Sequence, residues 1–173
     1  VEILLTHENY TFTDPLTYPT TKIEPRPRRV AMADVNNDGQ VDMIVAYGGD
    51  SNIGVFLGFA NGTFDSQTNY SVGSYDGSHS IVCVDLNGDN NIDIVSALTT
   101  VGTLEVLLGN GDGTFSVQRP YSTGYASLPV CVVSGDFNND SRWDIVTVNR
   151  DSNTIGLFLG YGDGSLARQI TFS

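Results

Sequence analysis

The chain has 173 residues, a formal net charge of −12 and a pI near 4.1, because 20 acidic residues outnumber eight Lys and Arg. This acidity argues against nucleic acids and anionic membrane surfaces as partners, since both are polyanionic. No apolar run approaches the roughly 18 residues of a membrane span, so membrane insertion is not expected. Val1 follows no signal-peptide pattern and is not an initiator Met, so we expect a mature or excised piece of a longer protein.

The chain begins in the middle of a repeat. Phe12 and Tyr18 are matched by Phe64 and Tyr70, each 52 residues later, in the last part of the next unit. We therefore expect residues 1–18 to form the last two strands of a four-strand unit whose first two strands are missing.

A nine-residue stretch then occurs three times, beginning at Asp34, Asp85 and Asp136, at intervals of 51 residues. Positions 1, 3, 5 and 9 carry carboxylate or amide oxygens, and position 7 can offer a backbone carbonyl. Hard oxygen ligands of this kind suit calcium, which takes six to eight of them. Each stretch holds three Asp, a formal charge of −3 whose repulsion a cation offsets.

The sequence thus predicts three calcium sites, with solvated Asx turns without metal as the alternative. The predicted ligands are Asp34, Asn36, Asp38, Gln40 and Asp42 in the first loop, Asp85, Asn87, Asp89, Asn91 and Asp93 in the second, and Asp136, Asn138, Asp140, Arg142 and Asp144 in the third.

These loops differ from an EF-hand, in which position 12 is a bidentate Glu followed by a helix. Here position 12 is Val45, Ser96 or Thr147, in apolar runs rich in β-branched residues. Such runs favour strands, so each loop is expected to connect two strands.

Every 51-residue unit is predicted to hold four strands. Strand one covers 30–33, 81–84 and 132–135, strand two 41–46, 92–97 and 143–148, and strand three 53–57, 103–108 and 155–159. Strand four follows a Gly-rich turn and ends near Tyr70, Tyr121 and the C-terminus. No 3.6-residue periodicity is present, so almost no helix is expected.

Strands one to three are apolar on successive residues, which indicates sheets covered on both faces. Small covered sheets that repeat every 40–50 residues are typical of β-propeller blades. The predicted fold class is therefore all-β, with blades of four antiparallel strands in one domain over residues 1–173. It holds a half blade at 1–18 and full blades at 28–71, 79–122 and 130–173.

The pattern Asp-x-Asn-x-Asp-x-x-x-Asp, followed by Leu-Gly-x-x-x-Gly-Thr-Phe at residues 57–64 and 108–115, resembles the FG-GAP/VCBS repeat of integrin-α-like propellers and related secreted lectins and enzymes. The resemblance implies four-stranded blades with calcium in the hairpin between strands one and two. The Gly of position 6 is present as Gly39 but is replaced by Asn90 and Ser141. Because Ser tolerates φ > 0 less well than Gly or Asn, the third loop is the least favourable of the three.

An extracellular location, secreted or at a cell surface, is expected because weak calcium sites suit millimolar calcium. Asn-x-Ser/Thr sequons at Asn9, Asn61 and Asn69 make glycosylation a further expectation, with chance occurrence in an Asn-rich chain as the alternative; a fourth, at Asn139, lies inside a metal loop and is not expected to be modified. Cys83 and Cys131 lie on strands of adjacent units, with opposite strand parity but a three-residue offset. Buried thiols are favoured over a disulfide, which stays open.

No catalytic constellation is recognisable, so the chain is not expected to be an enzyme. We expect a calcium-stabilised recognition or adhesion module for a glycan or an extracellular protein, with an accessory propeller of a secreted enzyme or a pure scaffold as alternatives. Variable loops on a rigid frame usually carry recognition, and the less uniform loops lie opposite the metal end. The candidate ligand-binding residues there are Tyr47, Tyr75, His79, Tyr125 and Arg150.

Three blades do not close a ring, because propellers close with about four to eight. Either self-association or continuation of the chain into further blades is therefore expected.

Overall fold

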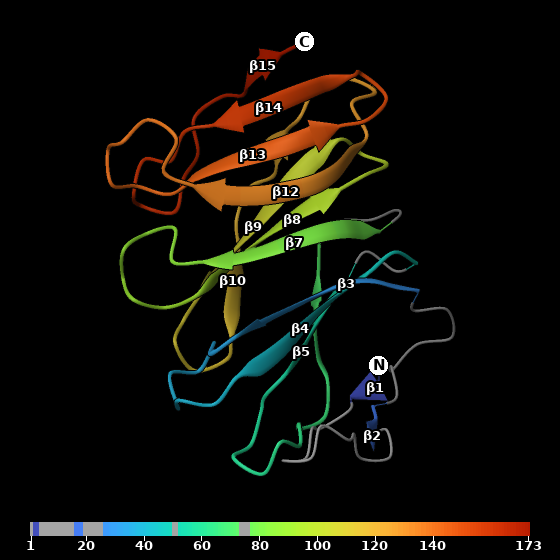
Figure 1. Ribbon diagram of the computed structural model, residues 1–173, viewed down its shortest axis with the longest axis vertical. Coiled ribbons are helices and arrows are strands. Elements are labelled where there is room, and N and C mark those ends of the chain that lie inside the picture. Colours follow the sequence, from blue (N-terminus) through green and yellow to red (C-terminus); the bar gives the residue numbers. More distant parts are fainter. Residues whose placement is uncertain (1, 4–15, 19–25, 50–51, 73–76) are drawn as a thin grey trace, which may run out of the picture.

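A computed structural model describes residues 2–3, 16–18, 26–49, 52–72 and 77–173. Over these residues the chain forms 15 strands in four antiparallel sheets, and the described part contains no helix (Figure 1). The all-β prediction is confirmed.

Three of the sheets repeat the same order of strands along the chain. The first contains β3 (Pro27–Ala33), β4 (Asp42–Tyr47), β5 (Asn52–Phe56) and β6 (Thr68–Ser71). The second contains β7 (Ser78–Val84), β8 (Asp93–Leu98), β9 (Thr103–Gly109), β10 (Phe115–Val117) and β11 (Tyr121–Ser122). The third contains β12 (Pro129–Gly135), β13 (Asp144–Asn149), β14 (Thr154–Phe158) and β15 (Ile170–Phe172). Each is a blade, and we refer to them as blades 1, 2 and 3.

The fourth strand of blade 2 is broken. Both β10 and β11 pair with β9, and Pro120 lies between them. Blades 1 and 3 have an isolated bridge at the place of β10, Gly58–Phe64 and Gly160–Leu166, followed by β6 and β15, so the interruption is common to the three blades. The sequence prediction of one continuous strand is therefore replaced by two short ones on the same edge.

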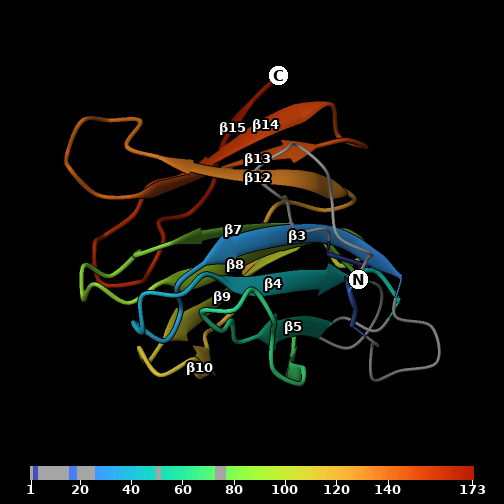
Figure 2. The ribbon, with the colours of Figure 1, turned by 60° about the horizontal axis from the view of Figure 1, so that its bottom comes forward.

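The first strands of the three blades lie at the centre of the arrangement, and the remaining strands extend outward from them. β7 contacts β3 on one side and β12 on the other, so the three first strands lie side by side in consecutive blades. Figure 2 shows the successive sheets layered face to face with these strands adjacent. This is the arrangement of consecutive blades around a β-propeller axis.

A half repeat precedes blade 1. Strands β1 (Glu2–Ile3) and β2 (Leu16–Thr17) pair with each other. The Tyr18 ring that follows packs edge-on against Phe56 and Phe64 of blade 1, with centroids 6.2 and 5.7 Å apart. The half repeat thus contacts blade 1 through its last strand.

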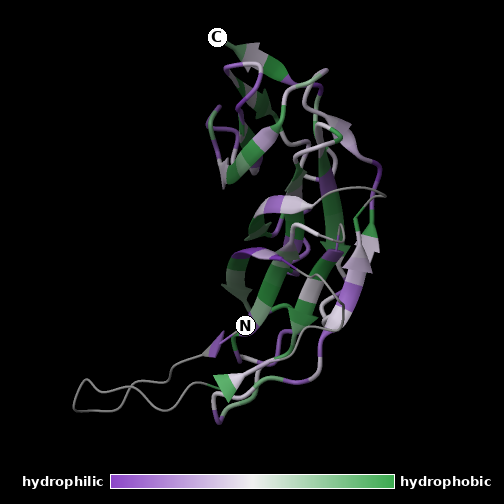
Figure 3. Ribbon diagram, turned by 90° about the vertical axis from the view of Figure 1, so that its right-hand side faces the viewer, coloured by the Kyte–Doolittle hydropathy of each residue, from purple (hydrophilic) through white to green (hydrophobic). Residues whose placement is uncertain are grey.

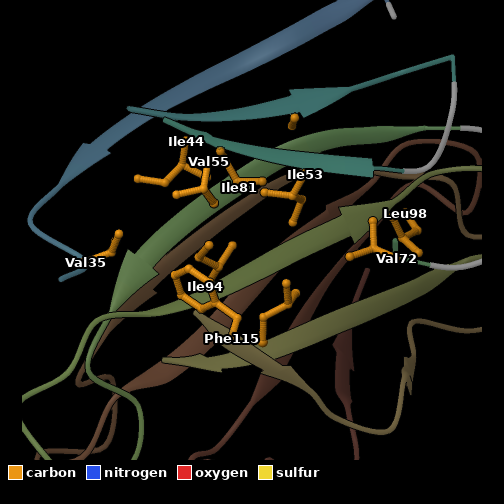
Figure 4. Close-up of a cluster of buried hydrophobic side chains, with 11 residues drawn as sticks. Val35, Ile44, Ile53, Val55, Val72, Ile81, Ile94, Leu98 and Phe115 are labelled. Atoms are coloured by element: carbon orange, nitrogen blue, oxygen red, sulfur yellow. The ribbon is translucent and has the colours of Figure 1, made fainter. Parts of the chain in front are cut away.

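Apolar side chains fill the spaces between blades. Between blades 1 and 2, Ile44, Ile53 and Val55 meet Ile81, Ile94 and Phe115 (Figure 4). A second cluster joins blades 2 and 3 and includes Val95, Leu104, Val106, Ile145 and Phe158. Figure 3 shows hydrophobic residues along the strands of these sheets. Burial of apolar surface, worth about 25 cal/mol per Å², is therefore the main force that holds neighbouring blades together.

The prediction that both faces of the strands are covered holds only where a blade has a neighbour on each side. β4 and β8 are buried throughout. On β3, however, Val30 and Met32 are 50% and 52% exposed, because the half repeat supplies only two described strands against blade 1.

The outer face of blade 3 is also uncovered. Val148, Ile155 and Phe172 are register partners in one row across β13, β14 and β15, and they are 44%, 49% and 53% exposed. Ala97 and Leu104 stand at the matching places of the first two in blade 2, where the packing of blade 3 buries both completely. We call this row and its flanking residues Val133, Val146, Leu157 and Ile170 the open face of blade 3.

Cys83 and Cys131 are both free thiols. Burial raises the pKa of Cys83 to about 12, so its thiol is un-ionised and inert at neutral pH. The cysteines are unbridged, as expected, but both are partly rather than fully buried.

Candidate metal loops and ligand cleft

The three predicted metal loops connect β3 to β4, β7 to β8 and β12 to β13, and they share one internal hydrogen-bond register. In the first loop, the Asp34 carboxylate accepts the backbone N–H groups of Asp38 (3.2 Å) and Gly39 (2.8 Å). The second and third loops repeat both bonds, at 3.1 and 2.9 Å in each. The backbone of each loop thus curves around its position-1 carboxylate.

The position-5 carboxylate adds a second repeated pattern. Asp38 accepts the N–H of Gln40 at 2.8 Å and an amide N–H of the Asn36 side chain at 2.9 Å. The corresponding bonds of Asp89 are 2.8 and 3.0 Å, and both bonds of Asp140 are 2.9 Å. Side chains at positions 1, 3 and 5 therefore converge within each loop.

Positions 4 and 6 of every loop have left-handed backbone. At position 6, φ is 80° at Gly39, 66° at Asn90 and 64° at Ser141. Position 4 has φ of 58° at Asn37 and 75° at Gly88. The need for φ > 0 at position 6 was predicted, and the strained Ser141 makes the third loop the least favourable conformationally. The need for φ > 0 at position 4 was not predicted, although the residues there in the three loops, Asn37, Gly88 and Asn139, are a signal for it.

Position 9 ties each loop to the end of strand three. The buried Asp42 carboxylate accepts the N–H of Val35 and the N–H of Gly58, each at 2.7 Å. Asp93 and Asp144 make the same pair of bonds, at 2.8 to 2.9 Å. The predicted metal ligand of position 9 therefore also has a structural role that sequence reasoning missed.

The glycine that receives this tie has no room for a side chain. A Cβ added at Gly58 would lie 2.2 Å from the carbonyl oxygen of Val41, and Gly109 and Gly160 are equally confined. The sequence signal for this contact was a recurring Leu-Gly pair whose Gly lies 16 residues after each position-9 Asp.

The loop carboxylates act on one another electrostatically. Burial raises the pKa of Asp42, two N–H donors oppose that rise, and the charges of Asp38 and Asp34 add to it. The pKa of Asp93 is raised for the same reasons, with Asp89 and Asp85 as the neighbouring charges. In the first two loops the carboxylates at positions 1, 5 and 9 therefore lie close enough to repel, and a cation would relieve that repulsion.

The donor chemistry of the loops fits calcium. In the described part of the chain, no group of three His, Cys, Asp or Glu side chains is already arranged around a common metal position. The loops nevertheless supply Asp and Asn oxygens, and each oxygen that accepts one N–H keeps a second lone pair for a metal. Asp34, Asn36, Asp38 and Asp42, with the Gln40 carbonyl, would hold the ion in the first loop, and the matching residues would do so in the other two.

A cleft of about 640 Å³ lies at the opposite end of blade 2. It is bounded by the β8–β9 connection at 99–102, the segment 122–128 and Asp151 of blade 3. The backbone here is strained, since Ala126 and Leu128 have φ of 52° and 51°. Strained loops on a rigid frame are a common feature of binding sites.

Two of the five candidate ligand-binding residues lie at this cleft. Tyr125 lines it and is fully exposed. Arg150 lies beside it, pairing with Asp151 at 3.2 Å and donating its N–H to the Leu128 carbonyl at 3.1 Å. The structure thus brings together two residues that are 25 positions apart in the sequence.

The other three candidates are elsewhere. Tyr47 is only 2% exposed, donates its hydroxyl to Gln67 at 3.2 Å and belongs to the core of blade 1, where burial raises its pKa to about 12. It offers no ring face to a ligand, because its strand is covered on both sides. His79 is half-buried on β7 and engaged in an interaction within the fold. Tyr75 lies outside the described residues.

The fold and the loops define a β-propeller built from 51-residue repeats. A family model described as FG-GAP-like repeat matches residues 34–96 and 85–147, and the chain belongs to this family. No curated protein matches the chain. A crystal structure of a protein from Lactobacillus plantarum matches with a TM-score of 0.63 and 17% identity over 98% of this chain. This chain covers 50% of that protein, and the likeness concerns the fold.

The described residues include no helix long and apolar enough to cross a membrane.

Proposed function

We propose that this chain is an extracellular recognition module whose blades are stabilised by three calcium ions. The observation that carries the proposal is the hydrogen-bond register shared by the three Asp-rich loops, each of which holds carboxylates at positions 1, 5 and 9. Calcium supplies the positive charge that such a loop lacks, and it prefers these oxygen ligands. FG-GAP-like repeats are typical of extracellular proteins, which supports the same compartment.

The ligand is proposed to bind in the cleft at the opposite end. Tyr125 offers a ring, Ser122 offers a hydroxyl, and Arg150 and Asp151 add charges of both signs at the rim. A concave site with an aromatic group and a few polar groups suits a glycan or a protein loop. No catalytic role is proposed for this chain.

A second candidate is an accessory or scaffold propeller within a larger secreted protein. The lengths of the two proteins favour this candidate, because the chain covers only half of the solved protein that shares its fold.

The test is a glycan array and an ectodomain-protein array, probed with the chain in 2 mM calcium or in EGTA. Binding that requires calcium and is lost in both Tyr125→Ala and Arg150→Ala supports the recognition module. Calcium-dependent stability without any array hit supports the scaffold instead. Binding that survives both substitutions would refute the cleft as the site.

A further inference from the structure

A second hollow lies between the metal loops of blades 2 and 3. Its volume is about 360 Å³, and its lining includes Asp85, Gly88, Arg142, Trp143, Tyr161 and Gly162. It lies at the metal end, opposite the cleft around Tyr125, and the proposed function makes no use of it.

The repeat provides an internal comparison for this hollow. Between the loops of blades 1 and 2, the Asn37 side chain donates to the Asn91 side chain at 2.8 Å. At the next junction the same two places, 51 residues on, are occupied by Gly88 and Arg142. Because Gly88 has no side chain, the bridge that joins the first two loops cannot form here.

The aromatic residues of the hollow differ from the residues at the matching junction between blades 1 and 2. Trp143 and Tyr161 stand where blade 2 has Ile92 and Asn110, and they are 43% and 57% exposed. Exposed Trp and Tyr provide large apolar faces at little entropic cost and are enriched where proteins bind ligands.

Arg142 is positioned to donate hydrogen bonds into the hollow. Its Nη1 donates to the Tyr161 carbonyl at 3.2 Å, and its Nε lies 3.3 Å from an Asp140 carboxylate oxygen. A guanidinium has five N–H groups in a rigid fork, so three are not accounted for by these two contacts. Its side chain is 45% exposed.

The local charge favours a neutral ligand. If the proposed calcium is bound, the third loop carries three Asp, one ion of charge +2 and Arg142, so its charge is −3 + 2 + 1 = 0. The second loop is then −3 + 2 = −1. An anion would be repelled by the second loop and by the protein's overall acidity, whereas the two loops together sum to 0 − 1 = −1, a weak attraction for a cation that Arg142 opposes.

We propose that this hollow binds a neutral pyranose sugar, and this inference rests on the proposed calcium ions. Trp143 and Tyr161 provide apolar faces for the C–H side of the ring, and Arg142 provides donors for its hydroxyl oxygens. Backbone and side-chain oxygens of the loops accept from the hydroxyl protons. A pocket of this volume accommodates one sugar residue, such as the terminal residue of a glycan.

Trp143 is the only tryptophan of the chain, so its fluorescence reports on this hollow. We would titrate the calcium-loaded protein with methyl glycosides of glucose, galactose, mannose and N-acetylglucosamine. We expect a saturable change in Trp143 emission with one of them, at millimolar concentrations, and matching heats in calorimetry. Melting curves in calcium and in EGTA, measured first, show separately whether the calcium proposal holds.

Two variants test the assignment with residues that the chain itself uses at the other junction. Gly88→Asn places the Asn37 side chain at the matching position and narrows the hollow, and Tyr161→Asn copies Asn110. Each should weaken sugar binding at least tenfold, with the far-ultraviolet circular dichroism spectrum unchanged. Val117→Ala, at an exposed position on β10 outside both hollows, should bind the sugar as the wild type does.

Three results would overturn the proposal. The first is a calcium-loaded protein whose Trp143 emission and heats respond to none of the glycosides. The second is binding that Gly88→Asn and Tyr161→Asn leave intact while Tyr125→Ala abolishes it, which would place the sugar in the other cleft. The third is a response to N-acetyl-lysine amide and to no sugar, which would indicate a protein side chain as the occupant.

Discussion

The hydroxyl of Tyr121, at the end of blade 2, accepts a hydrogen bond from the backbone N–H of Leu166 in blade 3 at 3.1 Å. Tyr18 of the half repeat makes the same bond with the N–H of Phe64 in blade 1, at 3.0 Å. Tyr70 stands at the matching place of blade 1, where its ring packs edge-on against Phe115 with a centroid distance of 5.3 Å. One tyrosine per junction thus links each unit to the next.

Replacing Tyr121 with Phe should lower stability by about 1 kcal/mol, because the Leu166 N–H loses its acceptor while the ring still packs. For a chain of this size, that corresponds to a fall in Tm of about 2–4 °C. Thermal unfolding followed by circular dichroism measures the change. Tyr125→Phe, at a fully exposed position, is the matched control, and an equal fall in both variants would contradict this role for the junction bond.

Removing calcium should lower Tm. An ion that binds only the folded chain stabilises it by RT ln(1 + [L]/Kd), about 2.7 kcal/mol per site at a hundredfold excess over Kd. Magnesium should substitute poorly, since it resists cages of many protein oxygens. Calorimetric titration should give three ions for the wild type and two for Asp85→Ala. An identical melting curve before and after exhaustive chelation would show that the loops do not need the metal.

Asp93→Ala should destabilise the protein even in EGTA. Its carboxylate accepts the N–H groups of Leu86 and Gly109, and both donors are left buried without a partner in the variant. Each unsatisfied donor costs about 1–3 kcal/mol, so the total loss should be about 2 kcal/mol or more. Asp89→Ala is the control, because Asp89 bonds only within its exposed loop. Equal melting temperatures of the two variants in EGTA would contradict a structural role for position 9.

Glu105→Gln should stabilise the protein at neutral pH. Glu105 is buried on β9, at the place that Gly54 and Gly156 occupy in the other blades, and burial raises its pKa. Because the folded-state pKa is raised, the contribution of Glu105 to the free energy of unfolding is fully present below the unfolded pKa, near 4.5. This contribution is lost as pH rises through the folded pKa. Each unit of elevation corresponds to about 1.4 kcal/mol. Tm of the variant should therefore exceed that of the wild type at pH 7 and converge with it near pH 4; a constant difference across this range would contradict the assignment.

The open face of blade 3 should make the isolated chain associate. Ile155 and Phe172 are about half exposed in a row whose counterpart in blade 2 is buried by the next blade. Exposed apolar patches of this kind favour association, here with a second copy of the chain. Light scattering after size exclusion in calcium should show mass above 18.6 kDa that rises with concentration, and Ile155→Lys should restore the monomer. A wild-type monomer across a wide concentration range would refute the expectation.

Much of the fold could be predicted because its signals are local and repeated. The apolar strands and the Asp-rich loops each occur three times at a 51-residue spacing, and this repetition excludes a chance pattern. The metal loops were placed between strands one and two because β-branched runs follow them.

The parts that could not be predicted depend on contacts between distant residues. Tyr47 was assigned to a loop that binds ligand, but it is the last residue of β4 and lies inside blade 1. The strand was predicted to end at residue 46, whereas β4 ends at Tyr47, and this one residue decides whether Tyr47 is in a loop or in the strand. Strand boundaries are the least certain feature of a sequence pattern. The two roles of Asp42 were equally hidden, because its second partner, Gly58, lies 16 residues away on another strand.

The tyrosine at each junction has a consequence for how such a chain can change in length. The half repeat and blades 1 and 2 each end in such a tyrosine, so duplicating the 51-residue segment of blade 1 or blade 2 would insert a blade that matches both neighbours at once. Phe172 stands where the earlier units have Tyr70 and Tyr121 and has no hydroxyl. A sheet packed against the open face of blade 3 would therefore lack the tyrosine bond that joins the half repeat to blade 1 and blade 2 to blade 3.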